Sequence, residues 1–229
     1  MGKRIISRAR GKGGPRYRAP SHRFAGKVSY PQKGKAKIID IIHDPARSAP
    51  LAKLKLEDGS EKLIIAASGA KVGDTIEIGS TERGNIAPLA KIPKGSFIFG
   101  METFPRSGPK ICCSAGVSAL LISHQPDSVI AQLPSKEFKK FHPNCLATVG
   151  APACSGRKEK LYVKAGQKFY AMQARNKLWP RSSAVKMNPL DHPFGGHTKP
   201  GWPKSVARGA PPGQKVGSLA SRRTGKRKK

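Results

Sequence analysis

The chain has 229 residues, a formal net charge of +31 at pH 7 and a mean hydropathy of −0.46. This length allows one large domain, or two small ones with extensions. No run of about 18 apolar residues occurs, and the basic start lacks the apolar core of a secretion signal, so the sequence predicts neither a membrane span nor a secreted protein.

The positive charge is concentrated at the two ends of the chain. Residues 1–37 hold twelve Lys and Arg and no acidic residue, and residues 165–229 hold fifteen against the single acid Asp191. The ends therefore carry 26 of the 31 net charges, with a body between them that is much closer to neutral. Such segments repel themselves and are stabilised by a dense polyanion whose counterions they replace. The charge distribution indicates a nucleic-acid partner.

Residues 1–35 are predicted to form a basic N-terminal arm. The stretch 11–20 has no usable apolar period, and its glycines and prolines favour an extended backbone that can approach a ligand closely. Tyr17, His22 and Phe24 lie between cations, where flat rings can stack on bases while Arg and Lys hold phosphates. The alternative is a disordered, solubilising tail.

Short β-runs follow the arm. In residues 36–84 they are expected at 38–42, 51–56, 63–65 and 74–78, with a hairpin turn at 57–60. In residues 85–164 they are expected at 97–99, 119–122, 129–133, from 138 onward and at 146–149. Strands this short and regularly spaced are typical of small barrels, so the chain is predicted to be mainly β with two barrels. A barrel of roughly sixty residues is near the lower limit for an independent core, so we expect the two to pack together.

Residues 165–229 are predicted to form a second basic arm. Ala165 to Asn176 is expected to be a short helix with Phe169 and Met172 on one side. Beyond Trp179, Gly and Pro recur so often that no regular element is expected.

The four cysteines contain no Cys-x-x-Cys pair, so the strongest zinc signature is absent. Reduced, buried thiols are the favoured interpretation. A metal site formed by Cys113, Cys145, Cys154 and a His stays open as an alternative. No cofactor is predicted.

One segment of the C-terminal arm is specific enough to indicate a family. It reads Asn188-Pro189-Leu190-Asp191-His192-Pro193-Phe194-Gly195-Gly196. This motif resembles the universal second protein of the large ribosomal subunit, and residues 18–23, 43–52, 179–181, 210–217 and 221–225 match that family in the same order. The first of these matches resembles the archaeal and eukaryotic branch.

The resemblance implies an oligonucleotide-binding (OB) barrel, then an SH3-like barrel, then an extended tail that threads into large-subunit rRNA near the peptidyl transferase centre. It implies a cytoplasmic, ribosome-bound protein that supports subunit association, tRNA binding and peptide-bond formation. The implied partners are large-subunit rRNA, neighbouring ribosomal proteins and the small subunit across an intersubunit bridge, with no membrane.

The predicted RNA-binding residues are basic, aromatic or part of the family motif. They are Arg4, Arg8, Arg10, Arg16, Arg18, His22, Arg23, Arg47, Arg175, Trp179, Arg181, Asn188, Asp191, His192, Phe194, Lys199, Arg222 and Arg223. Trp179, Phe194 and Trp202 are candidate stacking platforms. For Arg47 the alternative is a solvated surface charge, and for His192 it is a hydrogen bond within the protein alone.

The chain departs from the family pattern in two loops and in the length of its C-terminal tail. Cys112-Cys113-Ser114-Ala115-Gly116 stands where relatives usually carry an Arg before the Ser/Ala-Gly pair, so no arginine contact carries over to this position. Residues 153–157 replace a glycine-richer loop, and the stretch after Gly196 is shorter than in many relatives.

Two other classes of function compete with a ribosomal protein. The first is a non-ribosomal RNA- or chromatin-binding module with similar barrels, against which the family motif weighs. The second is an enzyme that acts on RNA through Asp191 and His192. Adjacent residues between two prolines seldom point into one pocket, and neither a Gly-x-Ser-x-Gly nor a phosphate-binding Walker loop is present, so the chain is predicted not to be an enzyme.

Overall fold

The structure, a computed structural model, describes residues 3–196 and 204–221. The chain divides into two compact units. The barrel unit is Pro20–Val163, and the terminal unit combines the residues up to Ala19 with those from Lys164 onward. Each unit is described by itself below.

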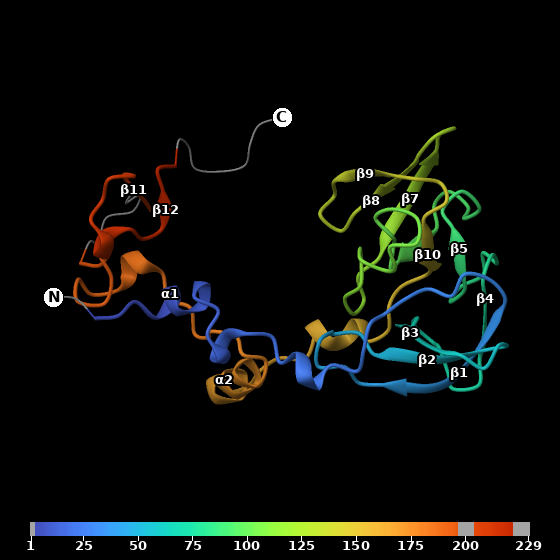
Figure 1. The fold of residues 1–229 in the computed structure, drawn as a ribbon, viewed down its shortest axis with the longest axis horizontal. Helices are drawn as coiled ribbons and strands as arrows, with labels where there is room; N and C mark the ends of the chain where they lie inside the picture. Colours follow the sequence, from blue (N-terminus) through green and yellow to red (C-terminus); the bar gives the residue numbers. More distant parts are fainter. Residues whose placement is uncertain (1–2, 197–203, 222–229) are drawn as a thin grey trace. The chain divides into compact units, whose positions relative to one another are not determined.

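The first sheet of the barrel unit has four antiparallel strands in the order β3-β2-β1-β4 (Figure 1). The strands are β1 Lys35–Ile42, β2 Leu51–Leu56, β3 Glu61–Ile65 and β4 Thr75–Glu77. The predicted hairpin at 57–60 is confirmed: Leu56 N–H donates to Ser60 O at 2.9 Å, and Gly59 adopts the left-handed φ of 79° that such a turn favours. Apolar side chains on one face of this sheet, among them Ile38, Leu54 and Ile64, form a buried core.

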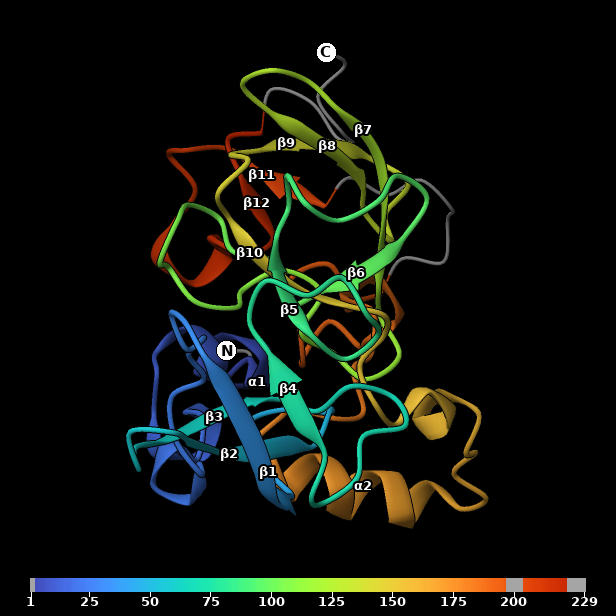
Figure 2. The same ribbon diagram turned by 90° about the vertical axis from the view of Figure 1, so that its right-hand side faces the viewer.

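The second sheet has six antiparallel strands in the order β5-β10-β6-β7-β8-β9 (Figure 2). The strands are β5 Ile86–Pro88, β6 Phe97–Phe99, β7 Ala119–His124, β8 Val129–Gln132, β9 Phe138–Phe141 and β10 Leu146–Val149. Its buried face includes Ile98, Leu121 and Ala131, and these side chains form a second core. Strand β5 was not predicted, because a three-residue strand that ends in Pro gives almost no β-signal.

The two sheets share buried residues. A third apolar cluster joins Leu51 and Ile65 of the first sheet to Phe99 of the second. The hydroxyl of Tyr30 donates to Gly100 O at 2.9 Å and lies 2.9 Å from the hydroxyl of Thr148. The prediction that the barrels pack together is therefore confirmed, as is the prediction of a mainly β chain whose first barrel is OB-like.

The terminal unit is built from both ends of the chain. It contains the helices α1, Ile6–Gly11, and α2, Ala165–Ala174, and the two-residue parallel strands β11, Ser205–Val206, and β12, Ser218–Leu219. Figure 1 shows the N-terminal segment, in blue, running beside the C-terminal segment, in orange. The Lys3 N–H donates to Leu190 O at 2.8 Å, and the Asn176 side-chain amide donates to Arg18 O at 2.8 Å.

The expectation that no regular element occurs beyond Trp179 is wrong, and the N-terminal arm also contains short elements. Besides α1, β11 and β12, single 3-10 turns occur at Pro15–Tyr17, Ser21–Arg23, Ala184–Lys186 and Pro212–Gln214. These elements are only two to six residues long, which is too short to give a hydrophobic period.

The predicted N-terminal arm, residues 1–35, is also divided between the units, since Pro20 begins the barrel unit. Val28 and Tyr30 are buried there, and Val28 forms a parallel bridge with Leu63. The predicted helix α2 is confirmed, with two residues fewer at its C-terminal end. Among residues 3–196 and 204–221, no helix is both long and apolar enough to cross a membrane.

Candidate nucleic-acid interface

The family motif forms a tightly folded loop, residues 187–196, which we call the Asp-His loop. The carbonyl oxygen of Asn188 accepts hydrogen bonds from the N–H groups of Asp191 at 3.0 Å and His192 at 3.2 Å. The Gly196 N–H closes the loop by donating to Met187 O at 3.1 Å. Backbone hydrogen bonds therefore fix the loop within the chain itself.

His192 is an internal part of this loop. His192 is only 5% exposed, and its Nδ1 accepts a hydrogen bond from the Phe194 N–H at 3.0 Å. Burial lowers the pKa of His192 below the ordinary value of an imidazole. A lowered pKa favours the neutral ring, which is the form that can accept this bond. For His192, the structure therefore contains the hydrogen bond within the protein that the sequence analysis left open as the alternative to an RNA contact.

Phe194 packs inside the terminal unit. The residue is 6% exposed, and its ring centroid lies 5.1 Å from that of His192. On its other side lies Gly217, where a Cβ would come within 2.9 Å of the ring. Phe194 was predicted to stack on RNA, but in this structure its ring joins the Asp-His loop to the turn before β12 and presents no open face.

Gly195 allows the Asp-His loop to close. A Cβ at this position would lie 2.3 Å from Asn188 O and 2.5 Å from Met187 O, closer than any real contact. Both obstacles are backbone atoms, so no side-chain rotation could relieve the overlap. The glycine of the motif is therefore required by the protein's own backbone.

A groove of about 550 Å³ runs between α1 and the Asp-His loop. Four cations of the N-terminal segment line the groove: Lys3, Arg4, Arg8 and Lys12. Among the described lining residues, Asp191 is the one acid. Arg8 lies in α1, Arg4 lies two residues before the helix and Lys12 is its C-cap, so the segment 3–12 supplies a row of cations along the groove. Such a row can hold successive phosphates of one strand.

Asp191 faces this groove and pairs with the N-terminal segment. Its Oδ1 lies 3.5 Å from the Nζ of Lys3, and both side chains are largely exposed. A pair this exposed contributes about 0–1 kcal/mol. Asp191 and His192 therefore have different partners, and the pair is not arranged as the acid–base dyad of the enzyme alternative.

The remaining predicted RNA-binding residues fall into three groups. Within the terminal unit, Arg10, Arg16, Arg18, Arg175, Arg181 and Asn188 are exposed and Trp179 is half-buried. His22 and Arg23 are exposed on the barrel unit. Lys199, Arg222 and Arg223, together with Trp202, lie outside the described residues.

Arg47 is engaged by the protein. Its guanidinium forms an ion pair with Asp44, a fully buried carboxylate, and Nη1 also donates to Gly26 O at 3.4 Å. Burial raises the pKa of Asp44, but hydrogen bonds from the N–H groups of Ala46 and Ala25 and the pairing with Arg47 together bring it below its ordinary value. Arg47 therefore fixes the loop before β2 and is not a freely solvated charge, while the predicted phosphate contact stays a prediction.

The cysteines lie in different surroundings. Cys145 is buried, Cys112 and Cys113 are half-buried, and Cys154 is exposed, which departs from the expectation of four buried thiols. Burial raises the pKa of Cys112 and of Cys113 to about 11, so neither is a reactive thiolate at neutral pH. In the part of the chain that the structure describes, no three His, Cys, Asp or Glu side chains are grouped so that they could hold a metal ion.

Sequence reasoning missed several residues that build the interface. Lys3 and Lys12 line the groove, and Gly217 lies against the Phe194 ring. Contacts between residues almost two hundred positions apart, such as Lys3 with Leu190, leave no local signal.

Comparisons with known proteins agree with this architecture. A family model described as "Ribosomal Proteins L2, RNA binding N-terminal domain" matches residues 2–78, and one described as "Ribosomal Proteins L2, C-terminal domain" matches residues 82–216. The protein named large ribosomal subunit protein uL2 is 46% identical in Methanopyrus kandleri over 239 aligned positions, covering 99% of this chain and 98% of the relative.

Two further relatives with the same name give similar values. The Halorubrum lacusprofundi protein is 47% identical, with 99% of this chain and 98% of the relative covered. The Methanothermobacter thermautotrophicus protein is 46% identical, with all of both chains covered. On the strength of two family models and of relatives that match along its whole length, this chain belongs to the ribosomal protein L2 family.

Proposed function

We propose that the chain is a structural constituent of the large ribosomal subunit and binds large-subunit rRNA. The observation that carries the proposal is the groove between α1 and the Asp-His loop, where four cations face one acid. Phosphates dominate protein–RNA affinity, and a row of Lys and Arg on a shaped surface is the feature that binds them. The names of the full-length relatives, which place those proteins in the large subunit, support the same function.

The proposal extends to the position of the protein in the ribosome. The chain lies near the peptidyl transferase centre and supports subunit association, tRNA binding and peptide-bond formation, as its family resemblance implies. It does so by positioning RNA, and chemistry on the substrate is left to the RNA. The burial of His192 and the use of its Nδ1 by Phe194 support a positioning role.

The proposed partners follow from this position. They are large-subunit rRNA, neighbouring ribosomal proteins and the small subunit across an intersubunit bridge. The proposed location is the ribosome in the cytoplasm.

Sedimentation of a cell extract through a sucrose gradient tests the proposed function. The tagged chain should travel with large subunits and with whole ribosomes, and should stay with large subunits at moderate salt. Recovery at the top of the gradient, or with messenger or chromatin particles, would support the competing RNA- or chromatin-binding module.

A further inference from the structure

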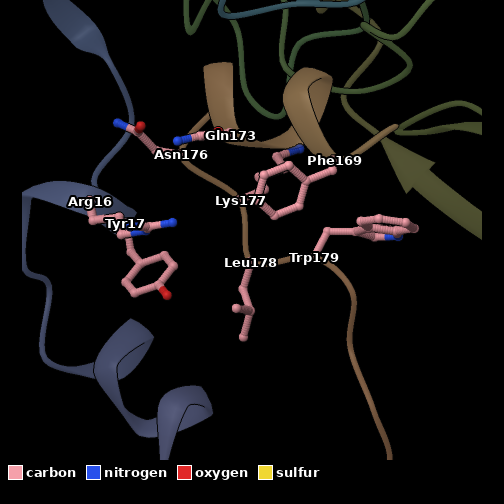
Figure 3. A pocket seen from close by; sticks show the side chains of 8 residues that line it. All are labelled: Arg16, Tyr17, Phe169, Gln173, Asn176, Lys177, Leu178 and Trp179. Carbon is pink, nitrogen blue, oxygen red and sulfur yellow. The ribbon is translucent and has the colours of Figure 1, made fainter. Parts of the chain in front are cut away.

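A second cavity in the terminal unit lies where the two ends of the chain meet. It has a volume of about 150 Å³. Arg16 and Tyr17 line it from the N-terminal segment, and Phe169 and Gln173 of α2 and residues 176–179 line it from the C-terminal segment. Figure 3 shows the Tyr17 ring on one side of the cavity and the rings of Phe169 and Trp179 on the other. Pockets for drug-sized molecules measure roughly 300–1,000 Å³, so this cavity suits a single flat ring system.

The end of helix α2 fixes the wall that carries Trp179. Asn176 adopts a left-handed φ of 52°, and the Lys177 N–H reaches back to Met172 O at 2.9 Å, as in a Schellman motif. The Asn176 side chain also ties this turn to Arg18 O of the opposite segment. The two aromatic walls are thereby held in position by the same residue.

Charge and polarity identify the occupant of the cavity. Its lining combines three aromatic rings with Arg16, Lys177 and two side-chain amides, and it contains no acidic residue. Lys168, on the same helix, lies with its Nζ 5.5 Å from the centroid of the Trp179 ring. An unstacked base of single-stranded RNA is recognised by three kinds of group. Aromatic rings stack on its face, side-chain amides pair with its edge, and cations hold the flanking phosphates.

We propose that this cavity, the aromatic pocket, takes one unpaired nucleobase of the bound RNA, which stacks on Trp179 or Tyr17 while Arg16 and Lys177 hold the neighbouring phosphates. The proposal rests on the proposed function, since it assigns a base-binding site within the RNA interface. It adds a contact with a base to an interface whose groove binds phosphates.

Two oligonucleotides of equal charge separate base binding from phosphate binding. The probes are a single-stranded 12-mer oligoribonucleotide and a 12-mer of the same backbone with abasic sites, each labelled for anisotropy and titrated with the full chain. Stacking on one aromatic residue is worth about 5- to 150-fold in affinity. Trp179→Leu and, separately, Tyr17→Leu should weaken binding of the base-containing 12-mer by about tenfold and leave the abasic 12-mer unaffected.

Phe138→Leu is the matched control. Phe138 is an exposed aromatic residue in β9 of the barrel unit and does not line the pocket, so this variant should bind both probes as the unchanged chain does. A Trp202→Phe background leaves Trp179 as the only tryptophan, and its fluorescence should be quenched by the base-containing probe alone. Thermal unfolding followed by circular dichroism checks that the variants remain folded, because a cationic chain binds the abasic probe by charge whether or not the pocket is formed.

The outcomes distinguish the pocket from the function on which it rests. Equal effects of Trp179→Leu on the two probes, or no effect on either, would overturn the pocket while the chain still sedimented with large subunits. Equal quenching by both probes would overturn it as well. A chain that failed to sediment with large subunits would instead overturn the proposed function.

Discussion

The Phe194 N–H donates a hydrogen bond to Nδ1 of His192 across 3.0 Å, and the two rings lie 5.1 Å apart. A buried imidazole that accepts at Nδ1 is neutral and carries its proton on Nε2. The family motif thus uses its histidine as a fixed part of the loop that forms one wall of the groove.

The first prediction concerns pH. Because burial lowers the pKa of His192 below about 6.5, the unfolded chain binds more protons than the folded chain between the two pKa values. The stabilising contribution of His192 is therefore present above pH 6.5 and is lost as the pH falls through the folded pKa. NMR titration of the full chain should give a His192 pKa below the ordinary value, and a pKa at or above it would contradict the assignment.

The second prediction concerns Nδ1 of His192, the atom that accepts the hydrogen bond from the Phe194 N–H. Asn places its amide oxygen near the position of Nδ1, whereas Gln reaches the more distant Nε2 position. His192→Asn should therefore destabilise the loop least and His192→Ala most, since Ala leaves a buried N–H without an acceptor at a cost of about 1–3 kcal/mol. Hydrogen exchange of the Phe194 amide measures this directly. Equal exchange rates in the Asn and Ala variants would show that the bond contributes nothing.

Gly195 provides the third prediction. A Cβ there meets two carbonyl oxygens of the backbone at 2.5 Å or less, so Gly195→Ala should open the Asp-His loop at a cost of about 1–3 kcal/mol. Gly209→Ala is the control, because a Cβ at Gly209 in the same unit meets nothing within 4 Å. Thermal unfolding of the two variants should differ by several degrees. If they unfolded at the same temperature, the steric account of the motif would be wrong.

The barrels show what sequence alone could predict. Alternating apolar residues at Leu54 and Leu56, and the turn around Gly59, predicted β2, β3 and their hairpin, because strand period and turn chemistry are local properties. The family motif in the same way singled out residues 188–196, which the structure shows as a hydrogen-bonded loop. These signals need only neighbouring residues.

The terminal unit shows where sequence reasoning ends. Phe194 was predicted to stack on RNA because the surrounding sequence contains little apolar material to bury it. The structure buries the Phe194 ring instead against the ring of His192 and against the turn at Gly217, just before β12. Arg47 was assigned to a phosphate for a similar reason, since the sequence gives no sign that Asp44 is fully buried.

Arg47 and Arg8 form a contrasting pair for the fourth prediction. Arg47→Gln removes the cation beside buried Asp44 and should cost up to about 3 kcal/mol of stability while leaving the salt dependence of rRNA binding unchanged. Arg8→Gln should instead preserve stability and lower the log–log salt slope by about 0.7–0.9. Denaturant unfolding and rRNA titrations at several salt concentrations measure both quantities. A reduced slope for Arg47→Gln would return this residue to the RNA interface.

Binding of the full chain to large-subunit rRNA over a series of salt concentrations tests the central claim, that the groove between α1 and the Asp-His loop binds RNA phosphates. One variant changes Lys3, Arg4, Arg8 and Lys12 to Gln, and its control changes four exposed lysines of the barrel unit, Lys55, Lys71, Lys91 and Lys94, to Gln. Both lose the same charge. The account predicts that the groove variant lowers the log–log salt slope by about 3 and the control by far less, whereas equal losses in the two variants would contradict it.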